Sequence, residues 1–507
     1  MSQAVAVAPR RESGRAAILR RGTAPAIGVL AAAVTLIGAG TPSFWGDEAA
    51  SVLSARRPLW SLWQELGQVD AVHGVYYLFL HVWIRIAGTS EFAVRLPSAL
   101  AAGAAVAGVV VLGGMLLNRR VGILAGLLML ALPEVTRVAI EARSYAFSMA
   151  AAVWLTVLLV ALVRRGERRR RWWALYAAGL AFGIYLFLYV GLLIPVHLVA
   201  VALLAARGDR MLRTWARAVA VALVLALPIV VAGIAQEHQI AFLGRRDYAG
   251  VEAVVVRQWF HSVPVAVLAW TLILAGVVLT LRRRASLAEG QPAALAAVLT
   301  WVVLPTAVLL MGNAWVTPMY NFRYTGLSLP AVALAMAIGA ERLGDLARGR
   351  RGGILTPALV VALALALALP VFLTQRGPFA KDGGADLRQT AAAVEAIAQP
   401  GDAVVFDQTV KPSRRPRLAL DLYPARFAGL DDIALLAPYA QRAALWDQVA
   451  PLDQADRHLA EHRTVVAVEG DGSASTDLLH LERLGFGVIT ERHVHRTTVY
   501  RLERGAP

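Results

Sequence analysis

The sequence predicts an all-α membrane protein with many spans, followed by a small α/β domain outside the membrane. The 507 residues are 58% hydrophobic and only 17% charged, with a mean hydropathy of +0.58. Soluble domains are nearer half apolar and a quarter charged. The chain has many apolar stretches of roughly 18–25 residues, long enough to cross a bilayer as helices. From about Arg376 onward, short β-rich runs alternate with amphipathic helices.

The apolar runs predict about eleven transmembrane helices. The region 172–206 can form two short spans that are broken at 189–191, or one long kinked span. Only the division into two keeps the later loops on their sides of the membrane, so we count two spans. His197 in this region is predicted to be a hydrogen-bonded core residue. The predicted spans are residues 24–41, 92–116, 121–133, 145–163, 172–188, 190–206, 214–234, 262–281, 293–312, 324–341 and 354–374.

Loop charges predict the orientation. The net charge is +16, but residues 376–507 hold 16 Lys and Arg against 18 Asp and Glu, so the basic excess belongs to the membrane part. Basic loops stay in the cytoplasm, and a folded basic surface for nucleic acid is not seen. We therefore expect a multi-pass plasma-membrane protein with its C-terminus outside. The expected inner loops are 118–120, 164–171, 207–213, 281–284 and 341–351.

Three regions follow from this orientation. Residues 1–23 form a basic cytoplasmic N-terminus, read as the start of a retained signal anchor because no small-residue cleavage site follows. Residues 24–375 form the transmembrane region, with a long first outer loop at 42–91. Residues 376–507 form the extracytoplasmic α/β domain. The chain has no cysteine, so disulfide and thiolate chemistry are excluded.

Acids, arginines and aromatic residues converge on the predicted outer face, whereas the inner loops carry almost only arginine. Such a set suits a reaction with an anionic leaving group. A carboxylate there can take a proton from an acceptor hydroxyl, and arginines can bind a phosphate and stabilise its charge. The candidates include Asp47, Glu48, His73, Tyr77, Glu141, Arg143, Tyr145, Arg245, Arg246, Arg323 and Tyr324.

Structural roles stay open for several of these residues. Asp47 and Glu48 begin a predicted helix, where acids favour the positive helix end and one of them can serve as the N-cap. Arg143 and Arg323 can be interfacial anchors or ion-pair partners. Interfacial tyrosines are ordinary belt residues.

The segments FWGDEA (44–49), the stretch 70–100, and EARSYAF (141–147) resemble the membrane glycosyltransferases of the GT-C superfamily. The likeness is closer to the bacterial branch that is similar to protein O-mannosyltransferases and lipid A aminoarabinose transferases, and actinobacterial mannosyltransferase-like proteins show this arrangement. It is strongest over about residues 25–160 and slight beyond 376. The family's proline-containing HPPLYY stretch corresponds to HGVYY (73–77), in which both prolines are absent.

The resemblance implies a GT-C fold and an inverting transfer from a polyprenyl-phosphate-linked sugar at the outer face, with mannose as the first expectation. It implies that Asp47 is the general base and that Glu48 assists it or binds the acceptor. It also implies substrate contacts by residues that match the family's motifs. These are His73, Tyr77, Glu141, Arg143, Tyr145, Arg323 and Tyr324. Arg95 and Pro97 match the family's pattern at the start of the second span.

We therefore expect a glycosyltransferase in which Arg143 and Arg323, with Arg245 or Arg246, hold the donor phosphate. The acceptor can be a glycan, a glycolipid or a protein. No cofactor is expected, and a divalent metal is not favoured because one adjacent acid pair is a poor cage for Mg²⁺. The alternative is a transporter or flippase for an anionic lipid-linked substrate, although no internal repeat is seen. A catalytically idle scaffold is a further alternative.

Overall fold

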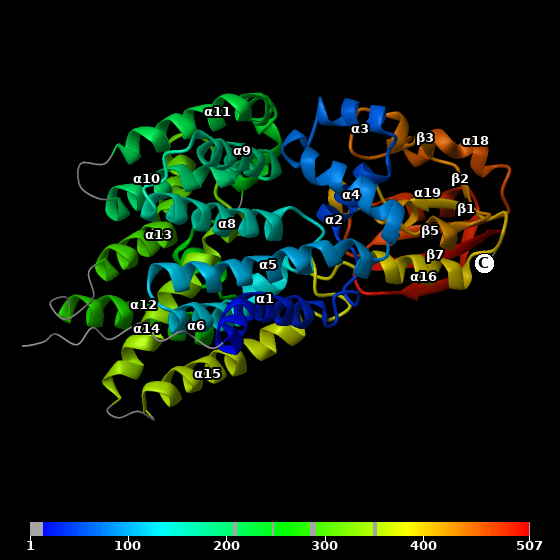
Figure 1. The fold of residues 1–507 in the computed structure, drawn as a ribbon. Helices are drawn as coiled ribbons and strands as arrows, with labels where there is room; N and C mark the ends of the chain where they lie inside the picture. Colours follow the sequence, from blue (N-terminus) through cyan, green and yellow to red (C-terminus); the bar gives the residue numbers. More distant parts are fainter. Residues whose placement is uncertain (1–13, 206–209, 246–247, 284–289, 348–351, 506–507) are drawn as a thin grey trace, which may run out of the picture.

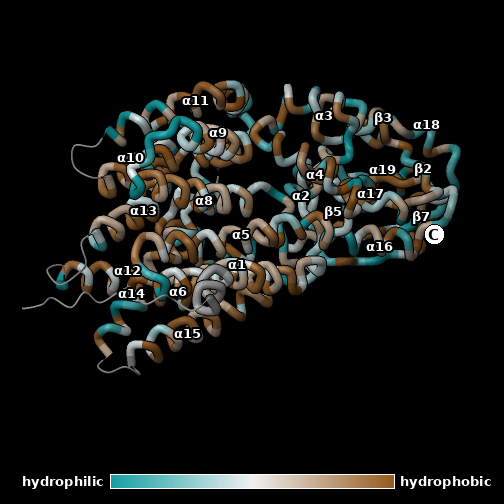
Figure 2. The backbone as a smooth tube through the Cα atoms, in the orientation of Figure 1, coloured by the Kyte–Doolittle hydropathy of each residue, from teal (hydrophilic) through white to brown (hydrophobic). Residues whose placement is uncertain are grey.

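The computed structural model describes residues 14–205, 210–245, 248–283, 290–347 and 352–505. A helical bundle forms one end of the molecule and an α/β region forms the other, with the helices of the first outer loop between them (Figure 1). The bundle helices carry mostly hydrophobic residues along their length (Figure 2). Both parts of the predicted fold class are thereby confirmed.

All eleven predicted apolar runs fold as helices. In the described part of the chain, seven helices are long and apolar enough to cross a membrane, and the count of eleven crossings stays a prediction. The bundle consists of α1 (Gly14–Leu36), α5 (Glu91–Leu116), α6 (Arg119–Leu130), α8 (Tyr145–Arg164), α9 (Arg170–Leu186), α10 (Leu193–Leu204), α11 (Met211–Ala235), α12 (Val263–Arg282), α13 (Gln291–Trp315), α14 (Leu329–Leu346) and α15 (Gly352–Thr374).

The predicted division of the 172–206 region is confirmed. Helix α9 ends at Leu186, a 3-10 turn covers Leu188–Leu192, and α10 follows. His197 on α10 is fully buried, and its two ring nitrogens lie 2.7 Å from the Tyr176 hydroxyl and 3.0 Å from the Thr156 hydroxyl. The prediction of a hydrogen-bonded core histidine is therefore correct.

Much of the predicted cytoplasmic face cannot be compared with the structure. Residues 1–13, including Arg10 and Arg11, lie outside the described residues, as do parts of three predicted inner loops at 206–209, 284–289 and 348–351.

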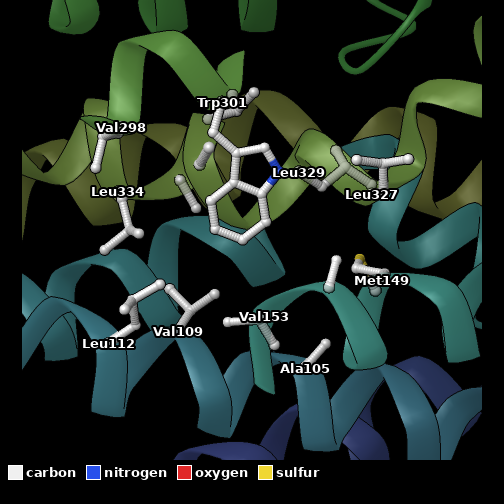
Figure 3. Close-up of a cluster of buried hydrophobic side chains, with 14 of the residues drawn as sticks. Ala105, Val109, Leu112, Met149, Val153, Val298, Trp301, Leu327, Leu329 and Leu334 are labelled. Carbon is white, nitrogen blue, oxygen red and sulfur yellow. The ribbon is translucent and has the colours of Figure 1, made fainter. Parts of the chain in front are cut away.

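Small residues let the bundle helices approach closely, as is common between helices in a membrane. A Cβ atom at Gly28 on α1 would lie 2.7 Å from the Gly103 carbonyl oxygen on α5. At Gly339 on α14 it would lie 1.9 Å from the Leu272 carbonyl oxygen on α12. Elsewhere large side chains fill the space, and Figure 3 shows Trp301 of α13 among aliphatic residues of α5, α8 and α14. The core thus fixes the helices that position the outer loops.

The first outer loop folds as three helices, α2 (Gly46–Arg56), α3 (Leu59–Leu66) and α4 (Gly74–Ala87). The second outer loop contains the short helix α7 (Pro133–Val138). Buried residues of α2 and α4 share one hydrophobic cluster with residues of the C-terminal sheet and its helices. The first outer loop and the C-terminal region therefore pack as one unit.

The C-terminal region contains a five-stranded sheet of order β2-β1-β5-β7-β6, parallel among its first three strands and antiparallel thereafter. The predicted alternation of β-rich runs and amphipathic helices from about Arg376 onward is confirmed. Its main elements are α16 (Leu387–Ile397), β1 (Ala403–Phe406), α17 (Leu418–Leu422), β2 (Asp431–Asp432), β3 (Leu435–Ala437), β4 (Gln448–Val449), α18 (Asp456–Leu459), β5 (Thr464–Gly470), α19 (Asp477–Arg483), β6 (Phe486–His493) and β7 (Thr497–Arg504).

Candidate active site

A cavity of about 630 Å³ lies where the outer-loop helices, the bundle and the C-terminal region meet. The start of α2 and the segment before α4 contribute polar residues to its wall. The end of α9, the 3-10 turn Leu188–Leu192 and the 3-10 helix Glu237–Arg245 contribute apolar residues. Asp382 and two segments of the C-terminal region, at 411–414 and 445–446, close the remaining side. Of the predicted site residues, the cavity lining includes Asp47, His73, Arg143, Tyr145, Arg323 and Tyr324.

Asp47 is the only carboxylate that the first turn of α2 presents to this cavity. Its oxygens lie 3.8 Å from an Arg143 nitrogen and 3.5 Å from an Arg323 nitrogen, and its side chain is 31% exposed. Enclosure by the protein raises the pKa of Asp47 above its ordinary value, although both arginines favour the anion. Asp47 is thus an ionisable group with open access and two cations beside it.

Helix capping does not explain the acid pair. The N-cap of α2 is Trp45, which makes no side-chain capping bond, and both acids lie inside the first turn. The suggestion that Asp47 or Glu48 is the N-cap is therefore wrong, although both acids still lie at the positive end of the helix dipole.

Glu48 is fully buried and its carboxylate is occupied. It forms a bidentate pair with Arg95, at 2.8 and 2.6 Å, and accepts the Ala142 backbone N–H at 3.0 Å. Lys381 lies 3.6 Å away. Although burial favours the neutral acid, Arg95 and Lys381 hold the pKa of Glu48 below its ordinary value. The expectation that Glu48 contacts the acceptor does not agree with this geometry, because the carboxylate does not line the cavity.

The contacts of Arg95 explain the structural role of Glu48. Its guanidinium donates to the backbone oxygens of Ala39, Pro42 and Ser43 in the turn before α2, while Glu48 holds its other side. The Glu48–Arg95 pair therefore fixes the beginning of α2, on which Asp47 stands.

Tyr77 orients Arg143 rather than lining the cavity. Its hydroxyl donates to Asp70 at 2.7 Å and accepts from Arg143 at 2.8 Å. Asp70 adopts a left-handed backbone conformation with φ of 56°. Both Asp70 and His73 line the cavity. Tyr77 of the HGVYY stretch thus acts through Arg143 even though both prolines are absent.

Arg323 is held from both sides. Its guanidinium carbon lies 4.7 Å from the centre of the Trp45 ring, and its backbone N–H donates to the Asn321 side chain. Beside it, Tyr324 stacks on Tyr189 with ring centres 4.9 Å apart. Phe187 contacts Tyr145 edge to face, which completes an aromatic wall. Flat faces of this kind suit sugar rings or an isoprenoid chain.

Glu141 belongs to a second cavity of about 540 Å³, which lies on the other side of Trp45 and Arg323. It pairs with Arg137, which also binds Glu134. Although burial favours the neutral acid, Arg137 and His261 lower the pKa of Glu134 to about 2. The structure therefore separates Glu141 from Arg143 and Tyr145, its neighbours in the motif.

Arg245 and Arg246 belong to the fourth predicted outer loop, residues 235–261. Arg245 ends a 3-10 helix that begins at Glu237, and Arg246 lies outside the described residues. Their predicted phosphate contacts stay predictions.

The C-terminal region supplies cavity residues that were not predicted. Lys411 and Arg414 lie in a turn packed against the start of α2, and Leu445 and Trp446 lie in a second segment. Packing is so close that a Cβ atom at Gly46 would lie 2.2 Å from the Ser413 carbonyl oxygen. The basic KPSRR run (411–415) was a signal available in the sequence, because the rest of residues 376–507 is net acidic.

The donor set does not fit a divalent metal. Among the described residues, no group of three or more His, Asp or Glu side chains is placed to hold an ion. Asp47 instead faces Arg143 and Arg323, and two cations at one carboxylate oppose a third. We derive no step through a metal.

The arrangement can perform acid–base chemistry beside a phosphate. A carboxylate of raised pKa can accept a proton, and Arg143 and Arg323 can bind an anion that approaches it. The apolar residues Phe187, Leu188, Ile240 and Phe242 offer a surface for a lipid chain.

The chain is similar to known proteins in part of its sequence and in its fold. Residues 74–233 match the family model described as dolichyl-phosphate-mannose-protein mannosyltransferase. The fold resembles that of ArnT from Cupriavidus metallidurans bound to undecaprenyl phosphate, with a TM-score of 0.56, 13% identity, and coverage of 96% of this chain and 98% of that one. The same protein in the apo state matches with a TM-score of 0.54 and 13% identity, and the match covers 93% of this chain and 97% of that one.

A more distant likeness is to the apo form of the Archaeoglobus fulgidus oligosaccharyltransferase, with a TM-score of 0.50 and 11% identity. It covers 87% of this chain and 69% of that one. No curated protein matches the sequence.

Proposed function

Because the chain has the GT-C fold in its PMT/ArnT-like form, we propose that it is a glycosyltransferase that uses a polyprenyl-phosphate-linked sugar at the outer face of the plasma membrane. The observation that carries the proposal is Asp47, an accessible carboxylate between Arg143 and Arg323 in a cavity with an apolar wall. The undecaprenyl phosphate bound to ArnT supports this donor class, and the matched family model makes mannose the first sugar to test.

The proposed reaction is a single in-line displacement. Asp47 accepts the proton of the acceptor hydroxyl, and the oxygen forms a new bond to the anomeric carbon. The bond between that carbon and the phosphate oxygen breaks, and the electron pair leaves with the phosphate. Arg143 and Arg323 stabilise the charge that develops there. Attack opposite to the leaving group inverts the anomeric configuration.

Purified protein in lipid nanodiscs, supplied with labelled polyprenyl-phosphate mannose, glucose or arabinose and a set of acceptors, tests the proposal. We expect free polyprenyl phosphate and a glycosylated acceptor with one of the sugars. A flippase would move the intact lipid between leaflets without cleaving it. Absence of cleavage with every donor, in protein shown to be folded, would overturn the proposal.

A further inference from the structure

Residues 439–446, called here the 439–446 segment, connect β3 to β4 and lie against α2 and α3 of the first outer loop (Figure 1). At its end, Leu445 and Trp446 line the cavity that contains Asp47. Trp446 is half-buried and also packs against the shared core of the outer loop and the sheet.

One buried arginine holds this segment in place. Arg57, fully buried at the end of α2, donates to the backbone oxygens of four of its residues. Its Nε lies 2.7 Å from Glu65, whose other oxygen accepts from Ser54. Those four carbonyl partners are Tyr439, Arg442, Ala444 and Leu445.

The far end of the segment is held as firmly. The Asp447 carboxylate accepts the Tyr439 backbone N–H and a bond from Arg417 at 2.9 Å. Arg417 also pairs with Asp432 of the sheet. A loop that is tied down at both ends presents Trp446 in a fixed position, and fixed aromatic groups bind at low entropic cost.

The position of Trp446 separates it from the membrane-facing wall. Phe187 and Leu188 belong to the bundle, where a lipid-linked donor would enter. Trp446 and Lys411 belong to the C-terminal region, on the side from which a water-soluble acceptor would approach. An indole ring is a large flat surface with a polar edge, which suits the apolar face of a pyranose or furanose ring.

We propose that the acceptor is a carbohydrate and that Trp446 is the residue on which its ring stacks, with Arg57 as the positioning residue that holds the 439–446 segment. This inference rests on the proposed glycosyl transfer. It narrows the acceptor from any hydroxyl to a sugar hydroxyl, and it gives the C-terminal region a role in acceptor selection.

The test uses the full-length protein with the donor that the wild type cleaves. The acceptor probes are octyl mannoside, octyl galactoside, octyl arabinofuranoside and a Ser/Thr-containing peptide. We expect a glycoside to be glycosylated and Trp446→Ala to raise its KM about tenfold or more. The glycoside KM of Trp446→Phe, which keeps a flat ring, should lie between those of the wild type and Trp446→Ala. Trp60→Ala is the matched control, because Trp60 on α3 is 57% exposed.

Arg57→Lys adds a readout that separates positioning from folding. It should raise the acceptor KM while kcat at saturating glycoside stays near the wild-type value, with thermal unfolding recorded in parallel. Glycosylation of the peptide alone, donor cleavage with no glycoside accepted, or an unchanged glycoside KM in Trp446→Ala overturns the inference. Absence of donor cleavage by the wild type overturns the proposed function itself, so the two failures are distinguishable.

Discussion

Asp47 and Glu48 are adjacent in the chain but lie in opposite environments. Asp47 faces the cavity and two arginines, whereas Glu48 is sealed inside against Arg95. Successive residues on a helix point about 100° apart, so one turn of α2 can carry both a reactive and a structural acid. The choice of Asp47 rather than Glu48 as the reactive acid therefore rests on the burial of Glu48 as well as on the family resemblance.

Removal of Arg323 should move the pH dependence of the reaction. Asp47 must be anionic to act as a base, so the rate falls as the pH falls through its pKa, which already lies above the ordinary value. Arg323 lowers this pKa, so Arg323→Gln should shift the acid limb of kcat/KM to higher pH. The measurement is a pH–rate profile with Arg257→Gln as the control, since Arg257 is 60% exposed and pairs with the exposed Glu252.

An acid limb that stays in place in Arg323→Gln would mean that another group controls the profile. An equal shift of the acid limb in Arg323→Gln and Arg257→Gln would indicate a general electrostatic effect rather than the loss of a contact with Asp47.

Glu48→Ala should destabilise the protein. It leaves Arg95 buried without its carboxylate, and breaking such a pair costs about 3–5 kcal/mol. Because the folded-state pKa of Glu48 is lowered, its contribution is present above the ordinary Glu pKa and is lost as the pH falls through the folded value. Thermal unfolding in detergent measures the effect.

Glu252→Ala is the control for that measurement. The Glu252–Arg257 pair is exposed on both sides, and such pairs contribute about 0–1 kcal/mol. Equal losses of stability in both variants would refute the structural role of Glu48.

At the scale of elements, the start of α2 depends on the turn at 411–414. Gly46→Ala places a methyl group 2.2 Å from the Ser413 backbone oxygen, so helix and turn must separate. We expect the free energy of unfolding to fall by about 1–3 kcal/mol, as is typical of overpacking. Transfer should also be slower, because Asp47 and Lys411 no longer keep their relative positions. Thermal unfolding and a transfer assay measure both effects.

Gly67→Ala is the matched control. Gly67 has φ of −69°, and a Cβ atom there would have its nearest contact at an ordinary 3.4 Å. If Gly46→Ala behaved like Gly67→Ala, the close docking of the turn on α2 would be incorrect.

Local patterns explain what the sequence could predict. Apolar runs identified the bundle helices, and short β-rich runs identified β1, β5, β6 and β7, because these signals depend only on neighbouring residues. The docking of Lys411 and Trp446 beside Asp47 could not be predicted, because it depends on the packing of segments far apart in the chain. Likewise, the EARSY pattern does not reveal that Glu141 and Arg143 face different cavities.

At the scale of the whole molecule, the account requires the cavity and the C-terminal region to lie outside the cell. The chain has no cysteine, so single cysteines can report the topology. In intact cells a membrane-impermeant maleimide should label Ala474→Cys and leave Arg165→Cys unlabelled until lysis; both sites are exposed. The reverse pattern would place the cavity in the cytoplasm and contradict the proposed donor side.

The central claim is that Asp47 removes the proton from the acceptor, and the most direct test is the transfer rate of Asp47→Asn with the donor that the wild type uses. Asparagine keeps the size of the side chain but cannot accept the proton. We predict a loss on the order of 10²–10⁴-fold in kcat, with an unchanged unfolding temperature. Turnover near that of the wild type would contradict the account.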